Sequence, residues 1–449
     1  MRNYEDHIEF NMMIKKCLLI ADDLTGGADA GAQFAKTGLS TLLISIQDDH
    51  KIDFSKYNDR DVLVVNTDSR GLSPEKAFSL VSSLLKRYNK EIFPIVYKKI
   101  DSTLRGNIGY EIDAILKQTN MSVCFIAPSY PEQNRTLVGG ILMVGGKPLA
   151  LTEVARDAAS PVQESHIQKL LEQQSLHKIG RIDLTDVASS RERLWKVVDE
   201  ERIKGTQIII FDAVTRQDLT NVADVAFVMD RTPLLVGSAG LAEELAKKLS
   251  PSKIEGISYS PRKEVKPIHH IFIVSGSTSS VTHEQLNRIE KRAEMASFQL
   301  NKSFIQNDEA SRQIETDNLF LAIGKSLTQG HVLLKICSER ILPKDPSDPS
   351  IHLQITKTLS QIALSALEAS KVELHDLALV LIGGDTALGV LNCLEVEGIE
   401  IDGELIEGIA MGHLIGGKWN GIRVITKAGA FGKDNALERI VESLGAKPP

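Results

Sequence analysis

The feature that most constrains the fold is a regular alternation of short apolar runs with amphipathic segments of helical length. In the first half of the chain each run predicts a buried strand, and segments such as 74–88 and 191–204 between the runs predict helices. Strands that alternate with helices in this way form βαβ units, so we expect a mainly parallel sheet. The predicted strands are 14–20, 40–46, 62–65, 92–97, 123–126, 208–211 and 234–236.

The alternation is interrupted once, over residues 251–270, where the sequence is polar and irregular and contains three prolines. Such a stretch is typical of a linker between domains. A chain of 449 residues is also too long for one ordinary hydrophobic core. We therefore expect two α/β domains with mainly parallel sheets, 1–250 and 271–449, and an active-site cleft between them. In the second domain we predict strands at 271–274, 378–382 and 422–426, helices from 279 and over 351–369, and a surface loop at 338–352.

Composition argues against several classes of function. The net charge of -7 disfavours a protein that lies on nucleic acid or on an anionic membrane. The four cysteines are far apart and the eleven histidines show no ligand spacing, which disfavours a disulfide framework and a zinc site and indicates the reducing cytoplasm. No stretch reaches the roughly 18 to 20 apolar residues of a membrane span, and from the polar first residues we expect no export signal. The absence of a GxSxG motif argues against a common class of hydrolase.

Two adjacent carboxylates, Asp22 and Asp23, follow the first predicted strand, and two glycines open the helix behind them. Ligands of doubly wound sheets bind at the carboxyl ends of strands, so this position suits a working carboxylate. Either aspartate could accept the proton of a substrate hydroxyl or bind substrate hydroxyls. The alternative is that one of them only caps the helix.

Cations follow the next strands of the same predicted sheet. The segment 98–107, KKIDSTLRGN, places three cations, an acid and two hydroxyls behind strand 92–97, as in an anion site at a helix N-terminus. Alternatively, Asp101 or Ser102 caps the helix while the cations face water. Arg70, behind strand 62–65, could form a bidentate pair with a carboxylate, although a surface salt bridge would explain it equally well.

Two polar segments, 127–135 and 152–157, are candidate walls of the same pocket. The paired glycines Gly139-Gly140 and Gly145-Gly146 predict a hairpin.

Three glycine-rich turns follow predicted strands of the second domain, at 274–280, 382–387 and 427–433. Their small residues would let backbone N–H groups wrap phosphates. None of them is a Walker A loop or a GxGxxG motif, and each alone could be an ordinary turn that needs glycine. Together the three turns predict a nucleotide cradle.

The chain resembles the four-carbon acid sugar kinase family, long catalogued as a domain of unknown function, which includes D-threonate, D-erythronate and 3-oxo-tetronate 4-kinases. The resemblance covers nearly the whole chain. It differs from the family at 407–412, which reads EGIAMG where the family pattern is close to PGVPLG, and this affects the expected shape of the nucleotide wall. The matching segments, in the family's order, are ADDLTGGADAGAQFAKTG, SRGLSPEKA, KKIDSTLRGN, APSYPEQNRTLVGG, VGSAGLAEELA, VSGSTSSVTHEQL, LIGGDTALGV and TKAGAFGKDNAL.

The resemblance implies an N-terminal domain that binds the sugar acid, a C-terminal domain that binds ATP, and a requirement for Mg²⁺, whose ligands it leaves unassigned. A homodimer is one possible assembly. Asp22 and Asp23 are the implied catalytic residues. The implied substrate contacts are Asp22, Arg70, Lys99, Ile100, Asp101, Ser102 and Arg105. The implied ATP contacts are Ser275, Ser277, Gly383, Gly384, Asp385, Thr386 and Gly429.

The expected reaction is in-line transfer of the γ-phosphate of ATP to the terminal (4-) hydroxyl of a small anionic sugar acid, D-threonate or D-erythronate. The segment ADDLTGGAD is closer to these kinases than to the 3-oxo branch, which has Phe after the aspartates where this chain has Leu24. One alternative is a 3-oxo-tetronate 4-kinase, and another is a nucleotide or metabolite sensor without turnover.

Overall fold

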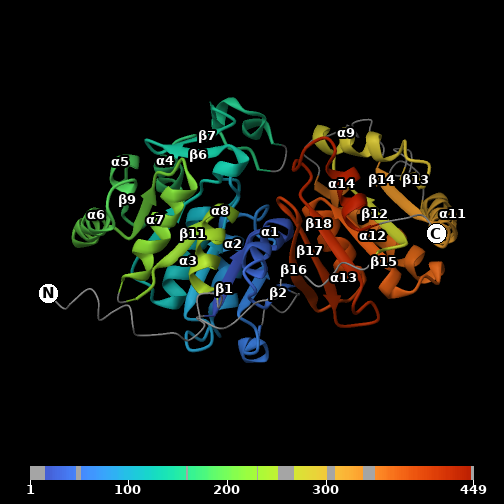
Figure 1. The fold of residues 1–449 in the computed structure, drawn as a ribbon, viewed down its shortest axis with the longest axis horizontal. Helices are drawn as coiled ribbons and strands as arrows, with labels where there is room; N and C mark the ends of the chain where they lie inside the picture. The colour runs from blue at the N-terminus through green and yellow to red at the C-terminus, as the bar shows by residue number, and fades with distance from the viewer. Residues whose placement is uncertain are drawn as a thin grey trace. The chain divides into compact units, whose positions relative to one another are not determined.

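The computed structural model of the chain describes residues 16–46, 52–157, 160–229, 231–250, 267–300, 309–336 and 349–445. It divides into two compact units, Met1–Tyr259 and Ser260–Pro449, and each unit has its own sheet and helices (Figure 1). Within these described ranges we find no helix that combines the length and the apolar character needed to cross a membrane. Most of the predicted linker, and the part of the predicted loop before Pro349, lie outside the described residues.

The first unit contains a parallel sheet in the order β2-β3-β1-β4-β11-β5-β10-β9. Seven of these strands correspond to the seven predicted ones. The sequence did not predict β9, because its IGRI segment is only half buried and has no continuous apolar run. The bounds are β1 Cys17–Ala21, β2 Thr41–Ser45, β3 Val62–Asn66, β4 Ile95–Lys99, β5 Cys124–Ala127, β9 Ile179–Ile182, β10 Ile208–Phe211 and β11 Leu234–Gly237.

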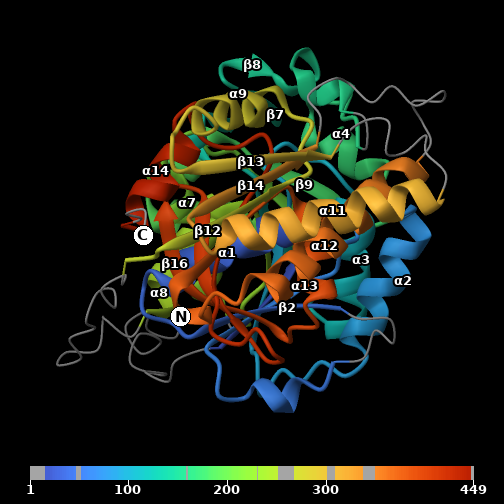
Figure 2. The same ribbon diagram turned by 90° about the vertical axis from the view of Figure 1, so that its right-hand side faces the viewer.

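Helices cover both faces of this sheet, which explains why its central strands are buried along their whole length. Helix α1 packs against α8 and α8 against α7, while α2 packs against α3; Figure 2 shows α2 and α3 on the side of this unit away from α7 and α8. Gly27 lets α1 approach the sheet, because a Cβ there would lie 3.1 Å from Ala21 Cβ. The bounds are α1 Leu24–Ala35, α2 Pro74–Leu85, α3 Ile108–Thr119, α4 Ile167–Glu172, α5 Leu184–Val187, α6 Arg191–Ile203, α7 Arg216–Phe227 and α8 Ala239–Leu249.

The glycine pairs at 139–140 and 145–146 form the turns of a small antiparallel sheet, as the sequence predicted. All four glycines have positive φ angles, between 57° and 77°. The sheet consists of β6 Arg135–Val138, β7 Ile141–Val144 and β8 Lys147–Pro148.

The second unit contains a mixed sheet in the order β13-β14-β12-β15-β18-β17-β16. The first five strands are parallel, and β17 and β16 are antiparallel to their neighbours. The sequence predicted only β12, β15 and β18, because each of the remaining strands contains polar or glycine residues that interrupt its apolar run. The bounds are β12 His270–Ser275, β13 Met295–Leu300, β14 His331–Ile336, β15 Leu377–Ile382, β16 Gly398–Ile406, β17 Ile409–Ile415 and β18 Arg423–Lys427.

Two groups of helices pack around this second sheet. Helices α9 and α14 close an apolar core together with β12, β15 and β18. Helix α11 packs against α12, and α12 against α13; Figure 2 shows α11 and α12 running side by side. The bounds are α9 Ser280–Ile289, α11 Glu309–Leu327, α12 Pro349–Ser370, α13 Gly384–Cys393 and α14 Ala436–Ser443.

Candidate functional site

Three neighbouring parallel strands bring the predicted substrate residues to one edge of the first sheet. In the register of β1, β3 and β4, Ala21 is opposite Asn66 on one side and Lys99 on the other. The segments that follow these strands, which carry the aspartates, Arg70 and the 98–107 cluster, therefore begin side by side.

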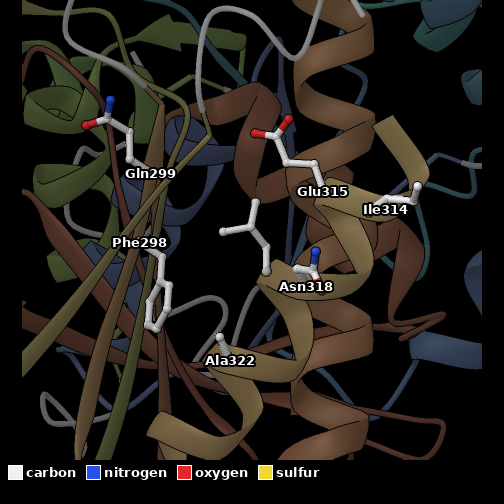
Figure 3. A pocket seen from close by; sticks show the side chains of 7 residues that line it. Phe298, Gln299, Ile314, Glu315, Asn318 and Ala322 are labelled. Atoms are coloured by element: carbon white, nitrogen blue, oxygen red, sulfur yellow. The ribbon is translucent and has the colours of Figure 1, made fainter. Parts of the chain in front are cut away.

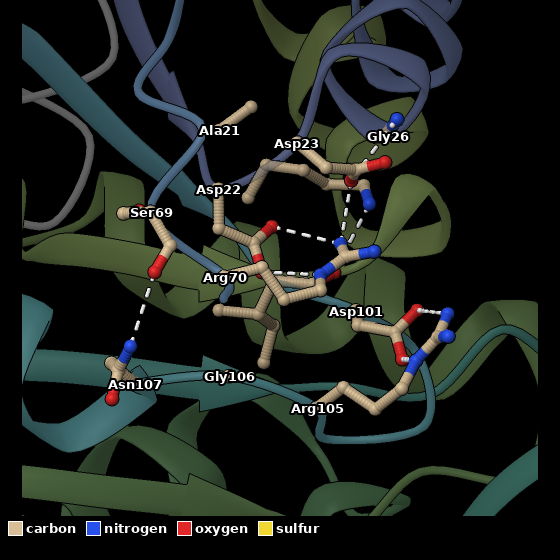
Figure 4. A network of polar contacts seen from close by, with 12 residues as sticks. Ala21, Asp22, Asp23, Gly26, Ser69, Arg70, Asp101, Arg105, Gly106 and Asn107 are labelled. Atoms are coloured by element: carbon tan, nitrogen blue, oxygen red, sulfur yellow. Dashed lines mark hydrogen bonds and ion pairs between the residues drawn. The ribbon is translucent and has the colours of Figure 1, made fainter. Parts of the chain in front are cut away.

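At the centre of this edge, one arginine holds both predicted catalytic carboxylates (Figure 4). Arg70 donates from Nε to Asp22 Oδ2 at 2.8 Å and from Nη2 to Asp22 Oδ1 at 3.0 Å. The same Nη2 lies 2.5 Å from Asp23 Oδ1. The backbone reinforces this contact, since Arg70 N–H donates to the Asp22 carbonyl at 3.2 Å. Arg70 therefore forms a bidentate pair, but with an acid of the chain itself; with only 18% of its side chain exposed, it is not the surface salt bridge of the alternative.

Asp23 also has the capping role that the sequence left open. Its carboxylate accepts a hydrogen bond from the N–H of Gly26 at 3.2 Å and from the hydroxyl of Thr25 at 2.7 Å, so it caps α1 while it binds Arg70. Asp22 is 3% exposed and does not have this role. The two aspartates are therefore held differently, although they are adjacent in sequence.

A second ion-paired cluster lies beside the first. Arg105 donates from Nε to Asp101 Oδ2 at 2.7 Å and from Nη1 to Asp157 Oδ2 at 3.1 Å, and Thr103 also donates to Asp101. The alternative that Asp101 or Ser102 caps the following helix is wrong, because the N-cap position of α3 is Asn107. Asp157 belongs to the 152–157 segment predicted to wall the pocket.

Burial and charge set the protonation of these carboxylates. Burial alone would raise the pKa of Asp22, but Arg70, Lys98 and Lys99 outweigh it and hold the pKa below its ordinary value. Burial likewise opposes the effect of Arg105 and Arg70 on Asp101, yet the pKa of Asp101 lies well below its ordinary value. Both carboxylates are therefore ionised at neutral pH.

Lys99 and two glycines complete the site. Lys99 is buried, and its Nζ donates to the carbonyl of Ile100 at 3.0 Å. A Cβ at Gly26 would lie 2.4 Å from Asp23 Oδ1 and 3.0 Å from Lys99 Nζ, so the ammonium group is close to that carboxylate. Gly106 has φ +97°, and a Cβ there would lie 3.2 Å from Asp22 Oδ2.

The remaining two predicted substrate residues, Ile100 and Ser102, differ in whether their polar groups already have hydrogen-bond partners in the protein. Ile100 is buried, and its N–H donates to the Gly237 carbonyl at 2.9 Å, so both of its backbone groups have protein partners. Ser102 is half-buried, and its hydroxyl has no hydrogen-bond partner among the described residues.

Sequence reasoning missed a buried ion pair beneath this site. Lys98 Nζ pairs with Glu111 Oε2, and both side chains are 1% exposed. Glu111 Oε1 accepts from Ser69 Oγ at 2.8 Å, and Ser69 Oγ lies 2.7 Å from Thr67 Oγ1. Burial raises the pKa of Glu111 against the opposing charge of Lys98. The signal in the sequence is that Glu111 falls on the apolar stripe of α3, where a carboxylate requires a buried partner.

In the second unit the three glycine-rich turns also meet at one edge of the sheet. The register of β12, β15 and β18 aligns Ser275 with Ile382 and Ile382 with Lys427. A Cβ at Gly276 would lie 2.4 Å from Thr386 Oγ1, and a Cβ at Gly429 would lie 2.5 Å from Ser277 Oγ. The first turn therefore contacts both of the others, as a single cradle requires.

This cradle has groups that fit a nucleotide phosphate. Ser275 Oγ is buried and has no hydrogen-bond partner among the described residues. Gly383 has φ +101°, and Gly384 and the exposed Asp385 begin α13, whose N-terminus offers backbone N–H groups. Thr282 on α9 donates to the Gly429 carbonyl, and Gln285 Nε2 donates to the Lys433 carbonyl at 2.9 Å. Sequence reasoning did not single out these last two residues, which hold the third turn.

A further hollow of about 540 Å³ lies between β13 and α11 in the second unit (Figure 3). Phe298 lines it from β13, and Glu315, Asn318 and Ala322 line it from α11. It lies apart from the three glycine-rich turns, and β13 is followed by residues outside the described ranges. We do not assign it to the candidate site.

Known families and proteins resemble the chain along almost its whole length. Residues 17–245 match a sugar-binding N-terminal domain and residues 272–437 a nucleotide-binding C-terminal domain. A D-threonate kinase of Salmonella typhimurium is 30% identical over 94% of this chain and 96% of its own. A D-erythronate kinase of Heliobacterium modesticaldum is 28% identical over 96% of this chain and 97% of its own. A 3-oxo-tetronate kinase of Brucella melitensis is 24% identical over 93% of each chain.

Two solved structures share the fold. A Salmonella typhimurium LT2 protein superposes with a TM-score of 0.76 at 21% identity, covering 95% of this chain and 98% of its own. A Haemophilus influenzae protein superposes with a TM-score of 0.67 at 23% identity, covering 95% and 99%. The mixed α/β fold predicted from the sequence is confirmed.

The fold, the two domain matches and the two strand-end sites define a class of protein that combines a sugar-binding domain with a nucleotide-binding domain. Within that class, the chain belongs to the four-carbon acid sugar kinase family, as its sequence predicted.

Proposed function

We propose that this chain transfers the γ-phosphate of ATP to the terminal (4-) hydroxyl of a four-carbon sugar acid, D-threonate or D-erythronate. One observation carries the proposal. This chain belongs to the kinase family, and it has a charged site at the strand ends of its sugar-binding domain and a glycine cradle at the strand ends of its nucleotide-binding domain. The 3-oxo-tetronate alternative is not favoured, because the relatives with that name are less similar than the D-threonate and D-erythronate kinases above.

The substrate carboxylate would bind Arg70 and Lys99. Arg70 uses Nε and Nη2 for the two aspartates, and its Nη1 has no partner among the described residues. Lys99 Nζ donates to one carbonyl, so it can still donate to an anion. Arg105 is engaged by two carboxylates, and we assign it to positioning Asp101. Asp101 and Ser102 would then contact substrate hydroxyls.

Asp22 and Asp23 would act on the attacking hydroxyl. An ionised carboxylate can accept the hydroxyl hydrogen bond and orient the oxygen towards the γ-phosphate. The pKa of Asp22 is lowered, which makes it a weak base, so its role is to orient the hydroxyl and to take the proton as the new P–O bond forms. Arg70 would keep the two carboxylates together during this step.

The cradle of the second unit would hold the nucleotide through Ser275, Ser277, Gly383, Gly384, Thr386 and Gly429. Mg²⁺ binds through one or two carboxylates together with phosphate oxygens and water, and it would neutralise phosphate charge. Asp385, which is exposed at the start of α13, is the carboxylate we assign to it.

We also propose the domain limits 1–250 and 271–449, with a linker between them. The division of the chain into units after Tyr259, and the two family matches that end at 245 and begin at 272, support these limits. The homodimer, the cytoplasmic location and the cleft between the domains stay predictions.

A coupled assay of ADP release tests the proposal, with MgATP and a panel of D-threonate, D-erythronate, their L-isomers and 3-oxo-tetronates. We expect turnover with D-threonate or D-erythronate. Folded protein that binds ATP and a sugar acid without releasing ADP would instead support the sensor alternative. Turnover with 3-oxo-tetronates alone would overturn the substrate assignment but not the reaction.

A further inference from the structure

Lys427, at the end of β18, is a buried lysine for which the proposed function so far gives no role. Its side chain is fully buried, and Nζ donates to the carbonyls of Ala428 at 3.1 Å and Gly429 at 3.3 Å. These two residues begin the third glycine-rich turn. Lys427 is also in register with Ile382 and, through it, with Ser275, at the strand ends that bear the other two turns.

Among the described residues, no carboxylate neutralises this lysine. Its register partner on the adjacent strand β15 is Ile382, which belongs to the apolar core, as does Ile409 of the other neighbouring strand, β17. Burial without a compensating charge lowers the pKa of Lys427 to about 7. None of the ionisable groups on the surrounding elements contacts Nζ within the described ranges. These groups are His283, Glu284 and Arg288 on α9, Glu438, Arg439 and Glu442 on α14, His413 on β17, Lys433 and Asp434 after the turn, and Asp385 on α13.

The contacts of Lys427 fix the direction of two peptide groups. In a trans peptide the C=O and N–H point in opposite directions. Because the carbonyls of Ala428 and Gly429 point towards Lys427 Nζ, the N–H groups of Gly429 and Ala430 point away from it, and neither finds an acceptor among the described residues. Thr282 also donates to the Gly429 carbonyl. Gly429 is half-buried and Ala430 exposed, so a ligand can reach this part of the turn.

We propose that Lys427 is a positioning residue for the nucleotide: it fixes the N–H groups of Gly429 and Ala430 towards a phosphate and supplies, from behind the turn, the charge that the phosphate requires. This inference rests on the proposed function and adds a consequence to it. A phosphate bound to these N–H groups stabilises the charged form of Lys427, so nucleotide binding takes up a proton when the free protein holds the lysine partly neutral.

The sign and size of this coupling follow from the pKa of about 7 in the free protein. At pH 6 the lysine is already charged, so binding takes up almost no proton. Uptake reaches about half a proton at pH 7 and about 0.9 at pH 8. The affinity for nucleotide should accordingly fall as the pH rises through 7, by up to about tenfold per pH unit.

Isothermal titration of the whole protein with MgADP tests this, with each pH measured in two buffers of different ionisation enthalpy. We expect proton uptake that grows from pH 6 to pH 8. Lys427→Arg keeps a permanent charge, so it should bind MgADP with no such growth, and comparison in the same buffers cancels the ionisation of the nucleotide itself. Lys427→Met should weaken binding at pH 6 by about 10- to 100-fold, the scale of a charge-assisted hydrogen bond.

The possible outcomes separate this inference from the function on which it rests. MgADP binding without pH-dependent proton uptake by the wild-type protein would overturn the role of Lys427 and leave the nucleotide site standing. Unchanged uptake in Lys427→Arg would do the same. If MgADP does not bind to folded wild-type protein, both the inference and the proposed function fail. The wild-type titration decides the question even if a variant does not fold.

Discussion

At the scale of single residues, the first site depends on how three charged groups share their contacts. Arg70 donates through Nε and Nη2 to Asp22 and Asp23, and its Nη1 has no partner among the described residues. A lysine cannot reproduce this, because its ammonium group is a point charge without a planar fork. The arginine therefore holds Asp22 and Asp23 together, and in our proposal its Nη1 also contacts the substrate carboxylate.

Replacing Arg70 tests this double role. Arg70→Ala should lower kcat/KM for the sugar acid by a factor that corresponds to about 2 to 4 kcal/mol of lost transition-state stabilisation. The variant removes a charge-assisted contact to a buried anion and no longer holds the two aspartates together. Arg70→Lys should recover only part of the loss. The measurement is steady-state kinetics, with the exposed Arg193→Ala as the matched control. An unchanged kcat/KM in Arg70→Ala would remove this residue from the site.

Asp101 carries a prediction about stability and pH. Its pKa in the folded protein lies well below the ordinary value of 3.8, so the unfolded chain binds its proton first as the pH falls. The carboxylate thus contributes stability that is complete above that ordinary value and is lost as the pH falls towards the folded-state pKa. Asp101→Asn lacks this contribution. The gap in unfolding free energy between wild type and variant should narrow from about pH 6 to about pH 3.

Denaturant unfolding at a series of pH values measures this gap, with Asp59→Asn as an exposed control. A gap of constant size down to pH 3 would mean that the ion pairs of Asp101 do not stabilise the folded state.

The sequence predicted the residues at the strand ends but not how they pair. Asp22, Arg70 and Lys99 follow three separate strands, and the parallel register brings them together as expected. The Lys98–Glu111 pair was missed because the partner of a buried charge lies on another element, 13 residues away, and only tertiary packing selects it. Lys427 falls in the predicted turn 427–433, but its burial was not predicted, because burial depends on packing between elements that are far apart in the sequence.

At the scale of elements, the glycine-rich turns are the parts most sensitive to added volume. A Cβ at Gly276 would meet Thr386 Oγ1 at 2.4 Å, so Gly276→Ala must push two turns of the cradle apart. We expect weaker MgADP binding, measured by titration, with an unchanged KM for the sugar acid at saturating ATP. Gly330→Ala is the matched control, because its Cβ would meet its nearest neighbour at 3.5 Å. Equal MgADP affinity in both variants would argue against a cradle at Gly276.

The burial of each strand explains whether the sequence predicted it. The central strands of both sheets are continuous apolar runs, and the sequence predicted them within a few residues. The edge strand β9 and the antiparallel strands β16 and β17 carry polar residues at intermediate positions, so no continuous run marks them. Their pairing depends on contacts between strands, which periodicity along the chain does not encode.

At the scale of the whole molecule, we propose that each unit binds one of the two reactants. The charged site belongs to the first unit, and the glycine cradle belongs to the second. Neither site alone defines a kinase, since a charged strand end can bind many acids and a glycine-rich turn many phosphates. The central claim is that the two sites hold the two substrates of one reaction, the sugar acid in the first unit and ATP in the second.

The most direct test is to identify the product. The protein is incubated with MgATP and D-threonate, and in parallel with D-erythronate, and the products are examined by ³¹P and ¹³C nuclear magnetic resonance. We expect a phosphate monoester on the 4-oxygen of at least one acid, formed together with ADP and lost in the Asp22→Asn Asp23→Asn double variant. Phosphate on another oxygen, or free phosphate with an unchanged acid, would rule out the proposed reaction.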